Sequence, residues 1–127
     1  MPQTAINATV PSTQQLVALL VLHLLAEHEG LTEAELRRRI TALSGEGFWR
    51  PGKGTVSEAV RDLLAQGAIK GEWRNPEGRR YRPLHLTPEG QHRLRDLREQ
   101  LREPVLIGRR FFDRLASTLY SSEWVRG

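Results

Sequence analysis

Hydrophobic residues at the start of the chain follow the spacing of an α-helix. Residues 12–29 are apolar on nearly every side, which is typical of a helix that other elements cover on several faces. Ser12 is placed to cap this helix, and Gly30 is placed to end it. The sequence therefore predicts a buried first helix.

A second helix is predicted after Gly30. Leu36, Ile40 and Leu43 fall on one face at helical spacing, so we expect that face to be buried. Thr32 and Glu35 have the spacing of a capping box, in which each side chain bonds the backbone N–H of the other residue.

A third, shorter helix follows the turn sequence Pro-Gly-Lys-Gly. Thr55 and Glu58 repeat the capping-box spacing, and Gly67 is placed to end the helix. Its predicted apolar stripe consists of Val56, Ala59, Val60, Leu63 and Leu64. The sequence thus predicts three helices in close succession.

The polarity pattern changes to that of a β-hairpin after the third helix. Apolar and polar residues alternate over 69–73, and the sequence Asn-Pro-Glu-Gly at 75–78 favours a turn. Residues 79–86 are predicted to form the returning strand, with Pro83 at an edge or a bulge because proline has no N–H for the ladder.

A long helical pattern occupies the end of the chain. Thr87 is placed to cap a helix that begins at Pro88, and Pro104 is expected to interrupt or kink it. Apolar residues then continue at spacings of three and four, which is typical of a coiled-coil seam. We expect this stripe to pair two copies of the chain. The candidate dimerisation residues are Leu101, Val105, Phe112, Leu115 and Leu119.

The order of these elements predicts the fold class. Three helices followed by an arginine-rich hairpin are the pattern of a winged helix-turn-helix, so we expect a mainly α fold with a small β-hairpin and a C-terminal dimerisation helix. The expected organisation is an N-terminal arm at 1–11, a winged helix-turn-helix DNA-binding domain at 12–86 and a C-terminal helical dimerisation region at 87–127.

Composition narrows the class of protein further. The chain has 127 residues, which suits one domain, and 19 Lys and Arg against 15 Asp and Glu give a net charge of +4 that favours an anionic partner. With no cysteine, disulfides and thiolate metal sites are excluded. The apolar run at 16–26 is too short to span a bilayer, and the N-terminus lacks the pattern of a signal peptide. We expect a soluble, cytoplasmic protein without a membrane partner.

The stretches "FWRPGKGTVSEAVRDLLAQGAI" and "RRYRPLHLTPEG" resemble the PadR-like transcriptional regulators over roughly residues 14–103. This resemblance implies a dimeric DNA-binding repressor that responds to small aromatic molecules or drugs as effectors. The sequence departs from the family pattern at Ser57 and Glu58, where a tyrosine and a basic residue are usual, and at Thr32 and Glu33, where Gly-Tyr is usual. These departures keep a second function open, namely a winged-helix protein-interaction module with little DNA affinity.

The candidate DNA-binding residues lie on the second helix, around the third helix and in the hairpin. They are Arg38, Lys53, Thr55, Ser57, Arg61, Lys70, Arg74, Arg79, Arg80 and Arg82. Arg61 is placed to bond a guanine edge, and its alternative is an ion pair with Glu58 or Asp62. Arg38 belongs to an arginine run whose alternatives are a solvated helix face and a phosphate contact.

Candidate chemistry of other kinds is weaker. Trp49, Trp73 and Tyr81 are candidates for stacking on an effector, and ordinary core and hinge packing is their alternative. The sequence Gly-Lys-Gly-Thr lacks the strand and the glycine spacing of a phosphate-binding loop. The four histidines lack ligand spacing, and no nucleophile, base or carboxylate pair stands out. We therefore expect no metal, no cofactor and no enzymatic activity.

Overall fold

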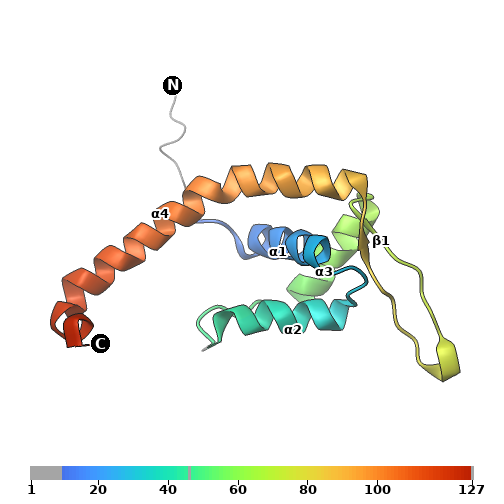
Figure 1. Cartoon of the computed structure of the whole chain (residues 1–127), viewed down its shortest axis with the longest axis horizontal. Helices are drawn as coiled ribbons and strands as arrows, with labels where there is room; N and C mark the ends of the chain where they lie inside the picture. Colours follow the sequence, from blue (N-terminus) through green and yellow to red (C-terminus); the bar gives the residue numbers. More distant parts are fainter. Residues whose placement is uncertain (1–9, 46, 127) are drawn as a thin grey trace. The chain divides into compact units, whose positions relative to one another are not determined.

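The described part of the chain folds into four α-helices and a short β-hairpin (Figure 1). The computed structural model describes residues 10–45 and 47–126, of which 122–126 are described by their backbone alone. The elements are, in order, α1 (Thr13–Glu27), α2 (Glu33–Ser44), α3 (Lys53–Ala65), β1 (Ile69–Lys70), the 3-10 turn η2 (Pro76–Gly78), β2 (His85–Leu86) and α4 (Pro88–Arg126).

Residues 12–98 form one compact unit, which includes the first part of α4, and the rest of α4 from Glu99 belongs to a second unit. Most of the arm expected at 1–11, namely residues 1–9, lies outside the described residues. No helix in the described ranges combines the length and the apolar character that crossing a bilayer requires.

The core of the compact unit is built around α1. This helix packs against α3, α2 and β2, and its residues Val17, Val21, Leu22 and Leu25 are buried. Several further side chains of α1 are half-buried against the same core, as expected for a helix that is apolar on most sides. The other buried members of this core are Leu31, Leu36, Ile40, Val56, Val60, Leu63, Ala68, Ile69, Leu84 and Leu97.

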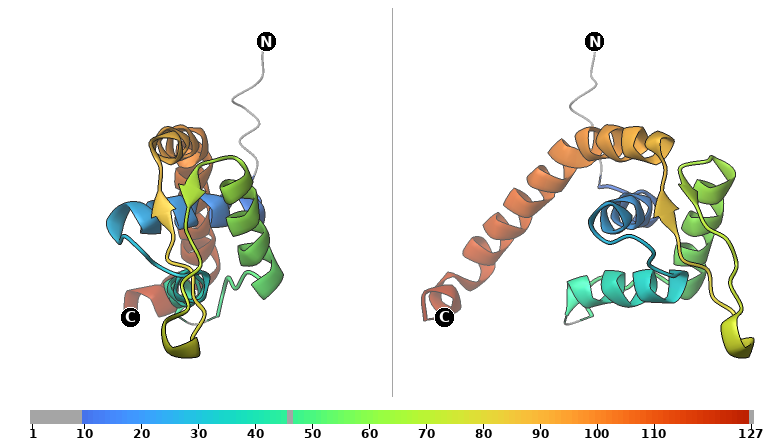
Figure 2. Two further views of the ribbon diagram at one scale, coloured as in Figure 1. Left: turned by 90° about the vertical axis from the view of Figure 1, so that its right-hand side faces the viewer. Right: turned by 45° about the vertical axis from the view of Figure 1, so that its right-hand side comes forward.

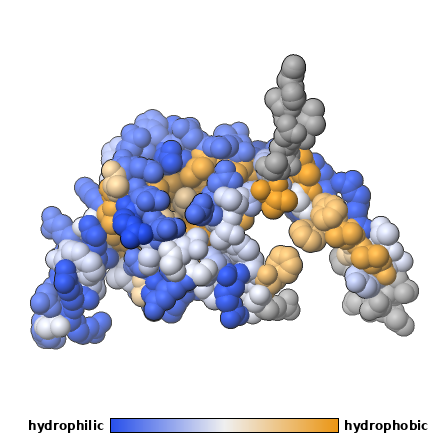
Figure 3. Space-filling model, turned by 180° about the vertical axis from the view of Figure 1, so that it is seen from behind, coloured by the Kyte–Doolittle hydropathy of each residue, from blue (hydrophilic) through white to orange (hydrophobic). Residues whose placement is uncertain are grey.

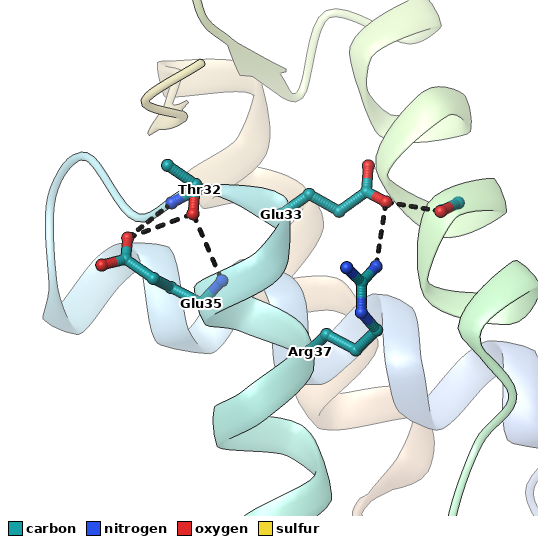
Figure 4. A network of polar contacts seen from close by, with 5 residues as sticks. Thr32, Glu33, Glu35 and Arg37 are labelled. Carbon is teal, nitrogen blue, oxygen red and sulfur yellow. Dashed lines mark hydrogen bonds and ion pairs between the residues drawn. The ribbon is translucent and has the colours of Figure 1, made fainter. Parts of the chain in front are cut away.

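Three of the predicted helix starts are confirmed. Ser12 forms a capping box with Gln15, and Thr32 forms one with Glu35 (Figure 4). Thr87 accepts a hydrogen bond from the backbone N–H of Gly90 at 3.0 Å, directly before α4 begins at Pro88. The backbone N–H of Thr32 donates to the Glu35 carboxylate, and this bond lowers the pKa of Glu35 because it stabilises the charged form.

The predicted capping box at Thr55 is wrong. α3 begins at Lys53 with Gly52 as its N-cap, and no side chain caps it. Thr55 therefore lies inside the first turn, with its N–H already bonded to the carbonyl of Gly52 at 3.0 Å. Leu43 also differs from expectation, because its side chain is 61% exposed at the last turn of α2 and does not join the buried face of Leu36 and Ile40.

The strands of the hairpin are shorter than predicted. Only Ile69 and Lys70 pair with Leu86 and His85, in antiparallel register. Beyond them the regular ladder ends near Pro83, which has no N–H to donate. The returning segment also leaves no room for a side chain at Gly71, where a Cβ would lie 2.4 Å from the carbonyl oxygen of Pro83.

An isolated bridge between Arg74 and Tyr81 closes the outer end of the hairpin around the turn η2. We call residues 71–84 the wing. Figure 2 shows the wing extending beside α3 and past the helices.

Candidate nucleic-acid interface

A concavity of about 760 Å³ lies between the start of α2, one face of α3 and the wing. Its lining includes buried apolar side chains such as Val60 and Leu84, and exposed charged and aromatic ones such as Arg61 and Trp73. The lining residues from the two helices are Thr32, Glu33, Ala34, Ser57, Val60, Arg61, Leu64 and Ala65. The wing contributes Trp73, Arg80, Tyr81, Arg82 and Leu84. The fold thus brings together side chains from three separate segments of the sequence.

Arg61 is exposed on α3, one helical turn after Ser57, and both line this concavity. The ion pairs between described side chains are Arg37–Glu33 and His85–Glu29. The predicted alternative, an ion pair of Arg61 with Glu58 or Asp62, does not form. The guanidinium of Arg61 is therefore available to a ligand in the concavity.

Glu33 connects the two helices of the helix-turn-helix (Figure 4). Its Oε2 atom accepts a hydrogen bond from Arg37 Nη1 at 3.2 Å and a short one from the hydroxyl of Ser57. About a third of each charged side chain in the Glu33–Arg37 pair remains exposed. This residue was not among the sequence candidates, although its departure from the Gly-Tyr of the family pattern was a signal at that position.

The wing arginines differ in their surroundings. The guanidinium of Arg80 lies 4.3 Å from the centre of the Trp73 ring, and that of Arg82 lies 5.6 Å from it. Arg82 Nε also donates to the carbonyl of Gly71 at 2.9 Å. Arg82 is thus half-buried and helps to hold the wing, whereas Arg74 and Arg79 are exposed.

The large concavity is not lined by five of the predicted cations, namely Arg38, Lys53, Lys70, Arg74 and Arg79. Lys70 lines a smaller cavity of about 270 Å³ on the hairpin, together with Arg74 and His85. Arg38 is exposed on α2. Lys53 is exposed at the first position of α3, where the uncapped N–H groups and the helix dipole favour an anion.

The three aromatic residues predicted to stack on an effector are not gathered in one place. Trp73 and Tyr81 line the concavity, but Trp49 is half-buried against the core. Its backbone N–H donates to the Ser44 hydroxyl at 3.1 Å. Trp49 therefore fits the alternative of hinge packing. Within the described ranges, no three His, Asp or Glu side chains are grouped as metal ligands.

The C-terminal part of α4 exposes an apolar row (Figure 3). Val105, Phe112 and Leu119 are 45%, 55% and 59% exposed, and they repeat every seven residues. Leu115 is half-buried. Leu101, by contrast, is 3% exposed within the single chain, so it lies apart from the exposed row.

The arrangement of three helices, a wing and a long fourth helix defines the winged helix-turn-helix class. A family model described as the transcriptional regulator PadR-like family matches residues 21–96. The chain belongs to this family of transcriptional regulators. No curated protein matches the sequence significantly.

Solved structures share the fold. A transcriptional regulator from Clostridium thermocellum has a TM-score of 0.64 at 21% identity, covering 80% of this chain and 98% of that one. A PadR family transcription regulator from Clostridium difficile has a TM-score of 0.58 at 19% identity, with coverages of 76% and 97%. Bacillus subtilis PadR in complex with operator DNA has a TM-score of 0.55 at 20% identity, covering 64% of this chain but 46% of that longer one.

Proposed function

We propose that this protein is a homodimeric, sequence-specific DNA-binding repressor that acts in the cytoplasm. The observation that carries the proposal is that two exposed arginines from different elements, Arg61 on α3 and Arg80 on the wing, line one concavity. In winged-helix proteins of this arrangement the third helix enters the major groove and the wing lies along the backbone. The complex of Bacillus subtilis PadR with operator DNA supports DNA binding by a protein of this fold.

The charge of the hairpin supports a phosphate contact. Residues 68–86 contain five Lys and Arg and two Glu, so this segment alone has a net charge of +3 against +4 for the whole chain. We propose Arg79 and Arg80 as positioning contacts to the DNA backbone, together with Arg74, Lys70 and the half-buried Arg82. Lys53 and Thr55 at the start of α3, and Arg38 on α2, complete the proposed phosphate contacts.

A salt titration tests the phosphate contacts. Each neutralised phosphate contributes about 0.9 to the slope of log affinity against log salt concentration. We expect Arg79→Ala/Arg80→Ala to lower affinity for all sequences and to reduce this slope by about 2. Fluorescence anisotropy with a randomised duplex measures both quantities. The control Arg98→Ala/Arg102→Ala removes the same charge from exposed positions on α4 and should leave the slope unchanged. An unchanged slope in the wing variant would remove the wing from the contacts.

The exposed row on α4 supports the homodimer. Val105, Phe112 and Leu119 keep to one stripe of the helix, and a seven-residue repeat is the spacing that pairs helices. A two-fold dimer would place the two α3 helices about 34 Å apart and require a palindromic site.

Sedimentation at micromolar concentration tests the dimer. We expect twice the chain mass of 14.5 kDa, and Phe112→Asp should give the single mass because a buried charge in the row opposes pairing. The control Ser117→Asp adds the same charge at an exposed polar position and should remain dimeric. A single mass for the unmodified protein would exclude the dimer.

The concavity also supports an effector-responsive repressor. Trp73 and Tyr81 lie on its rim beside Arg80, so an aromatic effector stacked there would occupy the face proposed to meet DNA. Bound effector and bound DNA would then exclude each other.

A further inference from the structure

The bond between Ser57 and Glu33 determines which hydrogen-bonding group Ser57 can offer to a base. A serine hydroxyl has one proton to donate and two lone pairs that accept. The proton of Ser57 is donated to Oε2 of Glu33, which is an acceptor on α2. The Ser57 oxygen therefore meets a partner in the concavity only as an acceptor.

Glu33 is held in this position from the other side. Arg37, one turn further along α2, donates to the same Oε2 atom at 3.2 Å. Arginine has donors and no acceptor, so Arg37 can only donate to this carboxylate, and the pair holds its Oε2 atom between α2 and α3. Glu33 is thus a positioning residue, because it fixes the direction of the Ser57 proton.

We propose that Ser57, held as an acceptor by Glu33, selects cytosine on the strand that faces it in the major groove. This inference rests on the proposed DNA binding. On one strand, cytosine and adenine present an amine donor, whereas guanine and thymine present an acceptor oxygen. An acceptor at Ser57 bonds the amines and is repelled by the oxygens.

Cytosine is favoured over adenine for a second reason. Adenine carries the N7 acceptor beside its amine on the same base, whereas the cytosine base itself carries only the amine donor, and the nearest acceptor belongs to the guanine on the other strand. The carboxylate of Glu33 lies next to the Ser57 hydroxyl, so a lone pair on the base would meet further negative charge. Arg61, about 6 Å further along α3, offers donors instead and suits a guanine.

Parallel selection from one randomised duplex library tests this inference. The proteins are the unmodified chain, Ser57→Ala, Ser57→Thr, Glu33→Gln and the control Glu27→Gln, which changes an exposed acid on α1. We expect the unmodified chain to enrich a motif with cytosine at one position next to a guanine. Ser57→Ala should lower the preference for cytosine over thymine there by about 3- to 10-fold, with the other positions retained.

The remaining variants show whether Ser57 recognises a base or only supports the fold. Glu33→Gln should also relax this one position, because an amide can donate to Ser57 and leave its proton free for a base oxygen. Ser57→Thr keeps the hydroxyl and should retain cytosine, as should Glu27→Gln. Thermal melting followed by circular dichroism identifies any variant that fails to fold.

Two outcomes overturn different statements. A motif whose every position is unchanged in both Ser57→Ala and Glu33→Gln, or one with guanine or thymine at the position they relax, overturns the inference about Ser57 and leaves DNA binding intact. The absence of any enriched motif for the unmodified chain, without salt-dependent affinity for duplex DNA, overturns the proposed function itself.

Discussion

The first turns of α2 and α3 carry the same Thr-x-x-Glu sequence and use it differently. In α2, Thr32 and Glu35 bond each other's backbone N–H groups and close the start of the helix. In α3, Thr55 lies inside the helix, and the start has no side-chain cap. The same four-residue pattern thus stabilises one helix and leaves its polar groups unused in the other.

The residues before each threonine explain the difference. Leu31 pairs with Leu84, whose N–H donates to the Leu31 carbonyl at 3.0 Å, so the chain is held extended up to the residue before Thr32. α2 cannot begin earlier. Before Thr55 there is no such bridge, and the carbonyl of Gly52 accepts from Thr55. The helix therefore begins two residues before the threonine that the pattern marks as its cap.

The functional consequence concerns which polar groups remain for a partner. On α2 the side chains of Thr32, Glu35 and Arg37 bond other groups of the chain. On α3, Thr55 and Arg61 have no such bond within the part of the chain that the structure describes. We infer that Thr32 and Glu35 at the start of α2 serve the fold, and that Arg61 on the outer face of α3 serves recognition.

The largest expected effect that tests this contrast is on DNA affinity when Arg61 on α3 or Arg38 on α2 is replaced by alanine. Arg61→Ala should reduce discrimination between the selected DNA site and a scrambled one by about 1–3 kcal/mol, because it removes a contact to a base edge. Arg38→Ala on α2 should weaken binding to both DNAs alike and reduce the salt slope by about 0.9, as expected for a phosphate contact. Anisotropy titrations with both duplexes measure these changes.

Two results would contradict the expected difference between Arg61 and Arg38. Equal losses on the selected and scrambled DNA in Arg61→Ala would make Arg61 a phosphate contact. Sequence-dependent losses in Arg38→Ala would mean that α2 also reads bases.

A smaller effect is expected on the free energy of unfolding when Thr32 or Thr55 is replaced by alanine. Thr32→Ala should lower the free energy of unfolding by about 1 kcal/mol, since it removes an N-cap. Thr55→Ala should change it by less than about 0.5 kcal/mol, because alanine is a good residue inside a helix. Urea denaturation at one fixed protein concentration measures both values. Similar losses in the two variants would show that Thr55 caps α3 after all.

The sequence was sufficient for the helices and insufficient for the polar contacts between them. Helix positions follow from local apolar spacing, so the stripe of α3, with Val56, Val60 and Leu63 buried, was predictable. The link from Glu33 to Ser57 spans 24 residues and depends on how α2 crosses α3. No pattern within one helix specifies such a contact.

The wing is a second region whose structure could not be predicted from local sequence patterns. The alternating polarity of the hairpin predicted two regular strands, but the paired strands are only two residues each and stop near Pro83, which cannot donate to a ladder. The different locations of the aromatic candidates also depend on contacts between residues far apart in the sequence. Trp49 is close to the third helix in sequence and packs on the core, whereas Trp73 reaches the concavity only because the wing folds back beside α3.

The smallest expected effect is on the free energy of unfolding when Glu35 or Glu58 is replaced by glutamine at different pH values. The pKa of Glu35 is lowered by the hydrogen bond from the Thr32 backbone N–H, so its charged form stabilises the folded state. This contribution is complete above the pKa of an unfolded glutamate, about 4.3, and is lost as the pH falls through the lowered value. Glu35→Gln keeps a side chain that can accept the capping bond and removes the charge. It should cost about 0.3 kcal/mol at pH 7, at the low end for an exposed group near a helix start.

The pH dependence of this cost separates charge from hydrogen bonding. At pH 3 the cost of Glu35→Gln should be smaller than at pH 7, because the contribution of the charge is lost as the pH falls through the lowered pKa of Glu35. Glu58→Gln should leave the free energy of unfolding unchanged at both pH values, since Glu58 is exposed and no capping bond forms at Thr55. Urea denaturation of the three proteins at pH 7 and pH 3 measures these differences. A cost for Glu35→Gln that is equal at both pH values would mean that geometry, and not charge, makes the start of α2 differ from that of α3.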